Sequence, residues 1–163
     1  MAGQIVNQAQ TATPGTPVTV LHVNTTSQAT TGTSEEVLAT YTLPANTLSS
    51  NGKAIRVTAW AATAANTNNK TLRIRVGGVG GTQVAANTAT LSAEPLNATV
   101  LLVRTGAATQ EAIGVTTKSS SLATTITTPT ATLSGTVDIV VTGQTATSAG
   151  DLTFRCLIVE ALN

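Results

Sequence analysis

The segment Lys70-Thr-Leu-Arg-Ile-Arg-Val76 decides the fold, because its residues from Thr71 to Val76 alternate between polar and apolar. In an extended chain, every second side chain projects to the same face. The alternation therefore predicts a β-strand with one buried face and one polar face. The buried set would be Leu72, Ile74 and Val76.

The same period of two recurs along most of the chain. Ile55, Val57 and Ala59 alternate with Arg56, Thr58 and Trp60, and the preceding Asn51-Gly52 pair is a strong signal for a tight turn. Residues 55–60 are therefore a second predicted strand. Further strands are predicted over residues 18–23, 36–43, 82–86, 99–105, 111–117, 122–127, 136–142 and 152–161.

Short segments rich in Gly, Pro, Asn, Ser and Thr separate these strands. Eight to ten short strands with regular turns predict an all-β, antiparallel sandwich or barrel. Only residues 59–65 and 91–96 are candidates for a helical turn, since no segment shows the spacing of an amphipathic helix.

The 163 residues are of a length typical of one domain. Pro14 and Pro17 lie among Thr and Gly, so residues 1–17 are predicted to be an extended arm and residues 18–163 one β-sandwich domain. The N-terminus lacks the positive and apolar regions of a signal peptide, and no window approaches eighteen apolar residues. We therefore expect neither export by that route nor a membrane partner.

Charged residues make up only 9% of the chain, the net charge is +1, and threonine alone contributes about a fifth of the residues. A surface so poor in charge opposes association only weakly and suits a protein with a fixed place in an assembly. Nucleic acid is not expected as a partner, because the eight basic residues are scattered. Aromatic residues are only 2% of the chain, so small aliphatic side chains must fill a thin core that oligomerisation would support.

The residue types of catalytic and metal centres are nearly missing from the sequence. His22 lies inside a predicted strand without a nucleophile motif, so we expect a structural role for it. Cys156 lies in an apolar run and is expected to be a buried small hydrophobe. One histidine and one cysteine do not supply a zinc site, and Asp138 and Asp151 are too isolated for a calcium loop. We expect no enzymatic activity, no catalytic residues, no metal and no cofactor.

Three further motifs have a plain structural interpretation. Glu35 and Glu36 are adjacent and would point to opposite faces of a strand, which predicts a solvated junction between loop and strand and not a general acid and base. The Gly77-Gly-Val-Gly-Gly81 run lacks the following helix and lysine of a phosphate loop and is predicted to be a turn between strands. The Asn-x-Thr triplets are expected by chance in a threonine-rich chain; they begin at Asn24, Asn69 and Asn97.

About a third of the chain resembles segments of small virion proteins of tailed bacteriophages. The resemblance is carried by Tyr41-Thr-Leu-Pro-Ala-Asn-Thr-Leu-Ser-Ser-Asn-Gly-Lys-Ala-Ile-Arg-Val-Thr-Ala-Trp60, by the segment from Ala65 to Val76 and, more loosely, by residues 150–160. It implies a jelly-roll-like β-sandwich without enzymatic activity. It also implies a virion component, either a capsid decoration (cement) protein or a small head-fibre or tail element, and commonly a homotrimer.

Two functional hypotheses follow. The first is a decoration protein, made in the host bacterial cytoplasm, that sits on the capsid surface of the virion, binds the major capsid protein or another virion protein and stabilises the head lattice. The second is a small tail or head-fibre module that binds a receptor or glycan, for which three aromatic residues offer little. For the first hypothesis the arm supplies the candidate capsid contacts, which are Ala2, Gly3, Gln4, Ile5, Val6 and Asn7.

Overall fold

The computed structural model describes residues 18–90, 92–119, 121–147 and 149–163, and these residues form strands and loops without a helix. The predicted arm, with its capsid-contact candidates Ala2 to Asn7, lies outside the described residues. The strands are β1 (Thr19–Asn24), β2 (Gln28–Ala29), β3 (Glu36–Leu43), β4 (Ala54–Thr63), β5 (Lys70–Val76), β6 (Thr82–Ala89), β7 (Leu96–Gly106), β8 (Thr109–Lys118), β9 (Ser121–Thr127), β10 (Val137–Thr145) and β11 (Leu152–Ala161).

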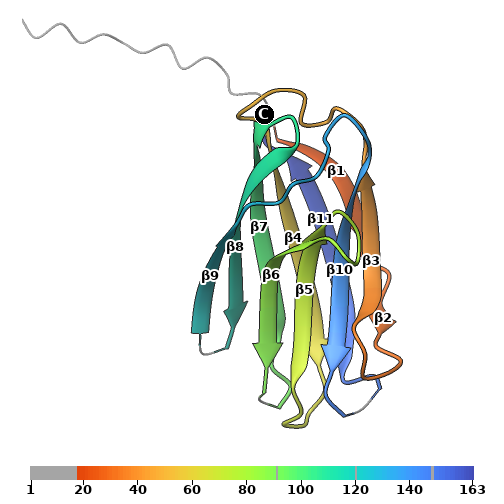
Figure 1. Ribbon diagram of the computed structural model, residues 1–163. Coiled ribbons are helices and arrows are strands. Elements are labelled where there is room, and N and C mark those ends of the chain that lie inside the picture. The colour runs from red at the N-terminus through yellow and green to blue at the C-terminus, as the bar shows by residue number, and fades with distance from the viewer. Residues whose placement is uncertain (1–17, 91, 120, 148) are drawn as a thin grey trace, which may run out of the picture.

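Two antiparallel sheets pack face to face, which confirms the predicted β-sandwich (Figure 1). The larger sheet has the order β1-β11-β4-β7-β8-β9, and β2 pairs with β11 next to β1. The smaller sheet has the order β3-β10-β5-β6. All ten predicted strands are present with ends that differ by three residues or fewer, and the two-residue β2 was not predicted.

The strand connections are those of a jelly roll. The jelly-roll strands form one long antiparallel ribbon of strand pairs, and the ribbon bends between β5 and β6. From the bend outward, the successive pairs are β5 with β6, β4 with β7, β3 with β10 and β1 with β11. Rolling this ribbon brings β11 beside β4 and β10 beside β5, which closes the two sheets. Eight strands arranged in this way are the double Greek key of jelly rolls. The β8–β9 hairpin is an addition between β7 and β10 that widens only the larger sheet.

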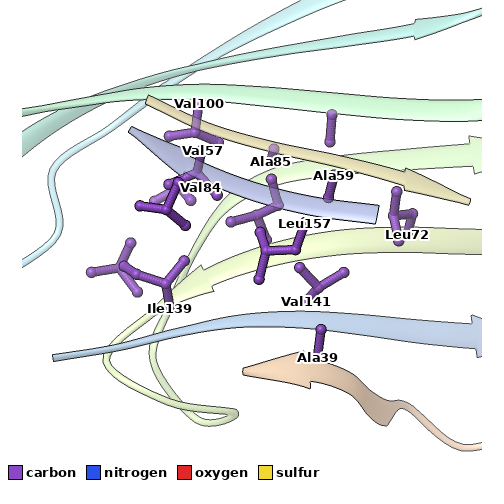
Figure 2. Packing of buried hydrophobic residues seen from close by; sticks show 14 of the residues in the cluster. Ala39, Val57, Ala59, Leu72, Val84, Ala85, Val100, Ile139, Val141 and Leu157 are labelled. Atoms are coloured by element: carbon purple, nitrogen blue, oxygen red, sulfur yellow. The ribbon is translucent and has the colours of Figure 1, made fainter. Parts of the chain in front are cut away.

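Small aliphatic side chains from both sheets fill the space between them, as the composition predicted (Figure 2). In β5, the predicted Leu72, Ile74 and Val76 are all buried, and Ile55, Val57 and Ala59 of β4 face them from the other sheet. Phe154 of β11 is the one buried aromatic residue in the described core. A buried apolar side chain of this size contributes about 1.5–3 kcal/mol, so the core depends on many modest contacts.

The edge strand β6 of the smaller sheet packs directly against β8 of the added hairpin. The backbone of β6 runs so close to Gly114 of β8 that a Cβ atom built on Gly114 would lie 2.2 Å from the carbonyl oxygen of Val84. Nearby, the buried Asn87 of β6 donates its side-chain amide to the carbonyl oxygens of Asn97 and Thr117 at 2.9 and 2.7 Å. Glycine and asparagine therefore join the two sheets where a larger apolar side chain would hold them apart.

The loops agree with the turn predictions, with one unexpected feature. Gly52 has a φ of +87° in the predicted Asn51-Gly52 turn, and Gly77 and Gly78 have positive φ in the turn between β5 and β6. The loop before β5 is built on Lys70, which is completely buried and donates its ammonium to the carbonyl oxygen of Asn66 at 2.5 Å. The burial of this lysine could not be predicted from its position at the start of a strand.

Neither predicted helical turn is present. Residues 59–63 continue β4, whose buried Ala59 and Ala61 pack into the core, and residues 92–96 form a turn followed by the first residue of β7. Residue 91 lies outside the described part of the chain. The prediction was wrong because alanine carries a helix preference that pairing with β7 and β11 overrides.

Candidate interaction surface

The outer surface of the larger sheet carries exposed large apolar side chains from four of its strands, β1, β4, β8 and β9. Paired residues on antiparallel strands point to the same side of a sheet. One row of such pairs crosses the sheet and consists of Ile126, Ile113, Leu101, Arg56, Glu160 and Val20. In this row Arg56 and Glu160 form an ion pair at 2.7 Å, with apolar residues on both sides of it.

We call this surface the apolar face, and define it by its exposed large apolar residues: Val20, Val23, Trp60, Ile113, Leu122 and Ile126. Leu122 and Ile126 of β9 are 68% and 67% exposed, and Ile113 of β8 is 37% exposed. Threonines occupy many positions between them, which include Thr58, Thr99, Thr117 and Thr124. A broad apolar and hydroxyl-bearing face with a single central ion pair is typical of a surface that contacts another protein.

The outer surface of the smaller sheet is different, because it is charged. Glu35 accepts hydrogen bonds from the guanidinium of Arg75 at 2.7 and 2.9 Å and from the hydroxyl of Thr142 at 2.5 Å, and Arg73 lies 3.8 Å away. The bonds from Arg75 outweigh the cost of partial burial and, with Thr142 and Arg73, hold the pKa of Glu35 at about 2, well below its usual 4.5.

Both carboxylate oxygens of the neighbouring Glu36 also accept hydrogen bonds. Its carboxylate accepts hydrogen bonds from the backbone N–H groups of Thr31 and Gly32 and from the Thr31 hydroxyl, and the bonds from Thr31 lower its pKa. The two glutamates do lie at the junction of loop and strand, as predicted, and each one bonds to its own set of partners. The prediction that they are simply solvated was wrong, because each one organises a separate network of donors.

The Glu35 network predicts an acid-sensitive fold. A carboxyl whose pKa is lowered by folding stabilises the folded state above pH 4.5, and that contribution is lost as the pH falls towards 2. After allowance for solvent screening, we expect Glu35→Gln to lower the free energy of unfolding by about 1–2 kcal/mol at pH 6 and by much less at pH 2. Urea unfolding at both pH values measures the difference. An equal loss at both would contradict this role for the charge.

A shallow open groove of about 560 Å³ lies at one end of the apolar face. The ring of Trp60, 40% exposed, forms one wall. Arg155 lines it as well, because the ladder between β4 and β11 shifts register between Phe154 and Cys156 and leaves Arg155 unpaired and exposed. The remaining lining residues are Ala61, Ala62, Pro95, Leu96, Asn97, Thr117, Lys118 and Ser119. An exposed aromatic ring beside a guanidinium and an amide can hold a small polar ligand or a partner side chain.

The sequence did indicate that Trp60 faces away from the core, since it alternates with Val57 and Ala59. It gave no sign of the groove, because Arg155 of β11 and Pro95, which precedes β7, are both distant from Trp60 in the sequence.

His22 and Cys156, the one histidine and the one cysteine of the sequence, both have structural surroundings, as predicted. The ring of His22 in β1 stacks on Tyr41 of β3, with centroids 4.8 Å apart and planes 21° apart, so the pair joins the edges of the two sheets. Cys156 is buried, and burial raises the pKa of its thiol. Within residues 18–90, 92–119, 121–147 and 149–163, no group of three or more His, Cys, Asp or Glu side chains is placed to hold a metal ion. No helix in these same ranges has the length and apolarity to cross a membrane.

Comparison with known proteins assigns the chain to no family. No family model matches it, and no curated protein sequence matches it. Among solved structures, the CBM2 module of the evolved Dit of Lactobacillus casei BL23 phage J-1 is similar with a TM-score of 0.41 and 10% identity, over 76% of this chain and 69% of that chain.

Two other structures are similar at the same level. A Bacillus endospore appendage, from a family of disulfide-linked pili, has a TM-score of 0.39 and 12% identity, over 91% of this chain and 92% of that chain. A chain of the infectious bursal disease virus Gt strain has a TM-score of 0.37 and 16% identity, over 90% of this chain and 33% of that chain. At these values the likenesses carry no conclusion about function.

Proposed function

We propose that this chain is a non-enzymatic structural protein of a bacteriophage particle that decorates the capsid and stabilises the head lattice. The apolar face carries this proposal, because it offers a wide contact area without a site for chemistry. Its partner would be the major capsid protein or another virion protein, and its location the capsid surface. The resemblance of residues 41–60 to phage virion segments and the low charge of the chain support the same proposal.

Stabilisation of a head needs no reaction. A protein that binds the assembled lattice and not its dissociated subunits shifts the equilibrium towards the lattice by mass action. A rigid sandwich suits this role because its strands fix the positions of Ile113, Ile126 and Val20 in one row, so little order has to be gained on binding.

Undecorated phage heads provide the test. We expect the purified protein to add to them in a fixed stoichiometry and to raise their resistance to heat, as measured by co-sedimentation and by release of DNA. Ile113→Lys places a charge within the apolar face, between Ile126 and Leu101, and should weaken binding at least about tenfold, the cost of burying an unpaired charge in an interface. Thr40→Lys, on an exposed position of β3 away from this face, is the matched control.

Absence of binding to heads would contradict the proposal. Equal binding by wild type and Ile113→Lys would show that decoration uses another surface.

The Trp60 groove favours a second candidate function, namely the binding of a glycan or a similar polar ligand. An aromatic ring beside convergent polar groups is the usual arrangement for sugar binding. Because Trp60 is the one tryptophan of the chain, its intrinsic fluorescence reports on the groove alone. A saturable fluorescence change with a glycan from an array, together with no binding to heads, would favour this second function over decoration.

A further inference from the structure

Strand β9 is an open edge of the larger sheet. Its seven residues, Ser121–Thr127, form a ladder with β8 and with no other described strand, and Figure 1 shows it beside β8, beyond β6 of the smaller sheet. Six of the seven residues are exposed, so both faces of the strand reach solvent. An exposed strand edge presents unpaired backbone N–H and C=O groups that can pair with another chain.

The other outer edges of the two sheets are irregular. The ladders of β1 with β11, β3 with β10 and β6 with β5 each contain a register shift, with Leu21, Leu38 and Val84 left without a partner. Bulges of this kind twist an edge and discourage pairing. The ladder of β9 with β8 runs without a shift from the Ala112–Thr127 pair to the Lys118–Ser121 pair.

The sequence of β9, Ser-Leu-Ala-Thr-Thr-Ile-Thr, also lacks the residues that protect edges. It contains no charged residue and no proline, and Leu122 and Ile126 are 68% and 67% exposed. Regular, uncharged edges with exposed apolar side chains are rare on proteins that remain alone in solution. This edge is therefore expected to be covered.

A second copy of β9 is the occupant that fits best, because the strand is complementary to itself. When two β9 strands run antiparallel with Thr124 opposite Thr124, Leu122 lies opposite Ile126 of the partner subunit on the apolar face. On the reverse side Ala123 lies opposite Thr125 of the partner subunit, and Thr pairs and apolar pairs are favourable across antiparallel strands. No like charges meet anywhere in this register.

We propose that β9 pairs with β9 of a second copy across a two-fold axis at Thr124, so that the two larger sheets become one continuous sheet. Such a contact is isologous and closes on itself, which is the commonest symmetry of soluble oligomers. The two apolar faces would then form one larger surface. This inference does not rest on the proposed function, since self-association and head binding are measured separately. The homotrimer implied by the family resemblance would need a different contact between copies, and the measured mass distinguishes a trimer from the proposed dimer.

Charge substitutions at the axis provide a selective test by sedimentation equilibrium of the full chain. Wild type should be a dimer. Thr124→Lys and Thr124→Glu each place like charges opposite one another, and should weaken association at least about tenfold. An equimolar mixture of the two variants should recover the dimer, because Lys then faces Glu. Thr40→Lys, on the edge strand β3, should leave the mass of a dimer unchanged, and circular dichroism should show the same β spectrum for every variant.

Three results would overturn the proposal. The first is a wild-type monomer at concentrations up to about 100 µM, which excludes dissociation constants in the micromolar range. The second is a dimer or trimer whose mass is the same in Thr124→Lys. The third is failure of the Lys and Glu variants to associate when mixed, which would show that Thr124 does not meet its own copy.

Discussion

Gly114→Ala is expected to lower the free energy of unfolding by about 3 kcal/mol, the upper part of the usual range for overpacking in a well-packed interior. The added methyl group would lie 2.2 Å from the carbonyl oxygen of Val84 and 3.1 Å from the Cβ atom of Ala85. The first of these is a backbone atom, so relief requires a shift of β6 as a whole. Such a shift would also lengthen the hydrogen bonds from Asn87 to the backbone of β7 and β8.

Gly135→Ala is the matched control for this substitution. The nearest atom to a Cβ built on Gly135 is 3.7 Å away, so the alanine fits and should be neutral or stabilising by a few tenths of a kcal/mol. Urea denaturation gives the two differences directly, provided the slope with urea is unchanged. Equal midpoints for the two variants would show that β6 does not pack against β8 as described.

Phe154→Ala is expected to cost about 3–5 kcal/mol, the range observed when a buried aromatic side chain is truncated. Phe154 is fully buried, and the other buried members of its core cluster are Val, Leu, Ile and Ala side chains. Branched aliphatic side chains have few alternative rotamers, so they cannot move into the space that the ring leaves. Since domains are usually stable by only about 5–15 kcal/mol, the variant should be close to unfolding at 37 °C.

Phe154→Leu keeps most of the buried volume and should cost about 1 kcal/mol. Thermal and urea unfolding of the three proteins measures the series. If Phe154→Ala lost less free energy of unfolding than Phe154→Leu, the neighbouring strands must close over the cavity.

The strands could be predicted from the sequence because burial on one face enforces alternation at every second residue. Lys70–Val76 shows this clearly, since Leu72, Ile74 and Val76 are buried while the two arginines between them lie on the outer surface. The order of the strands could not be predicted in the same way. Nothing in β4 or β11 specifies that they are neighbours, because pairing depends on the packing of the whole ribbon.

The candidate surface was harder to predict than the fold. Leu122 and Ile126 lie on one side of β9 among Ala and Thr, in the pattern of a half-buried strand, and the sequence cannot show that the smaller sheet ends before it reaches them. Glu35 was placed correctly at a junction of loop and strand, but its partners Arg75 and Thr142 are 40 and 107 residues away in the sequence. Chemistry that depends on contacts between distant strands leaves no local pattern.

The rolled ribbon also determines when the protein can fold during synthesis. The pair of β5 and β6 forms early, because the two strands are neighbours in the sequence. In contrast, β1 must wait for β11, which follows all the other described strands in the chain and lies between β1 and β4. Until residues 152–161 leave the ribosome, β1 has no partner strand in the larger sheet, and the edge of β4 that later pairs with β11 stays open. Folding dominated by such distant pairings is slow, and the nascent chain is open to aggregation in the interval. Efficient production of this protein should therefore depend on temperature and on chaperones more strongly than its small size suggests.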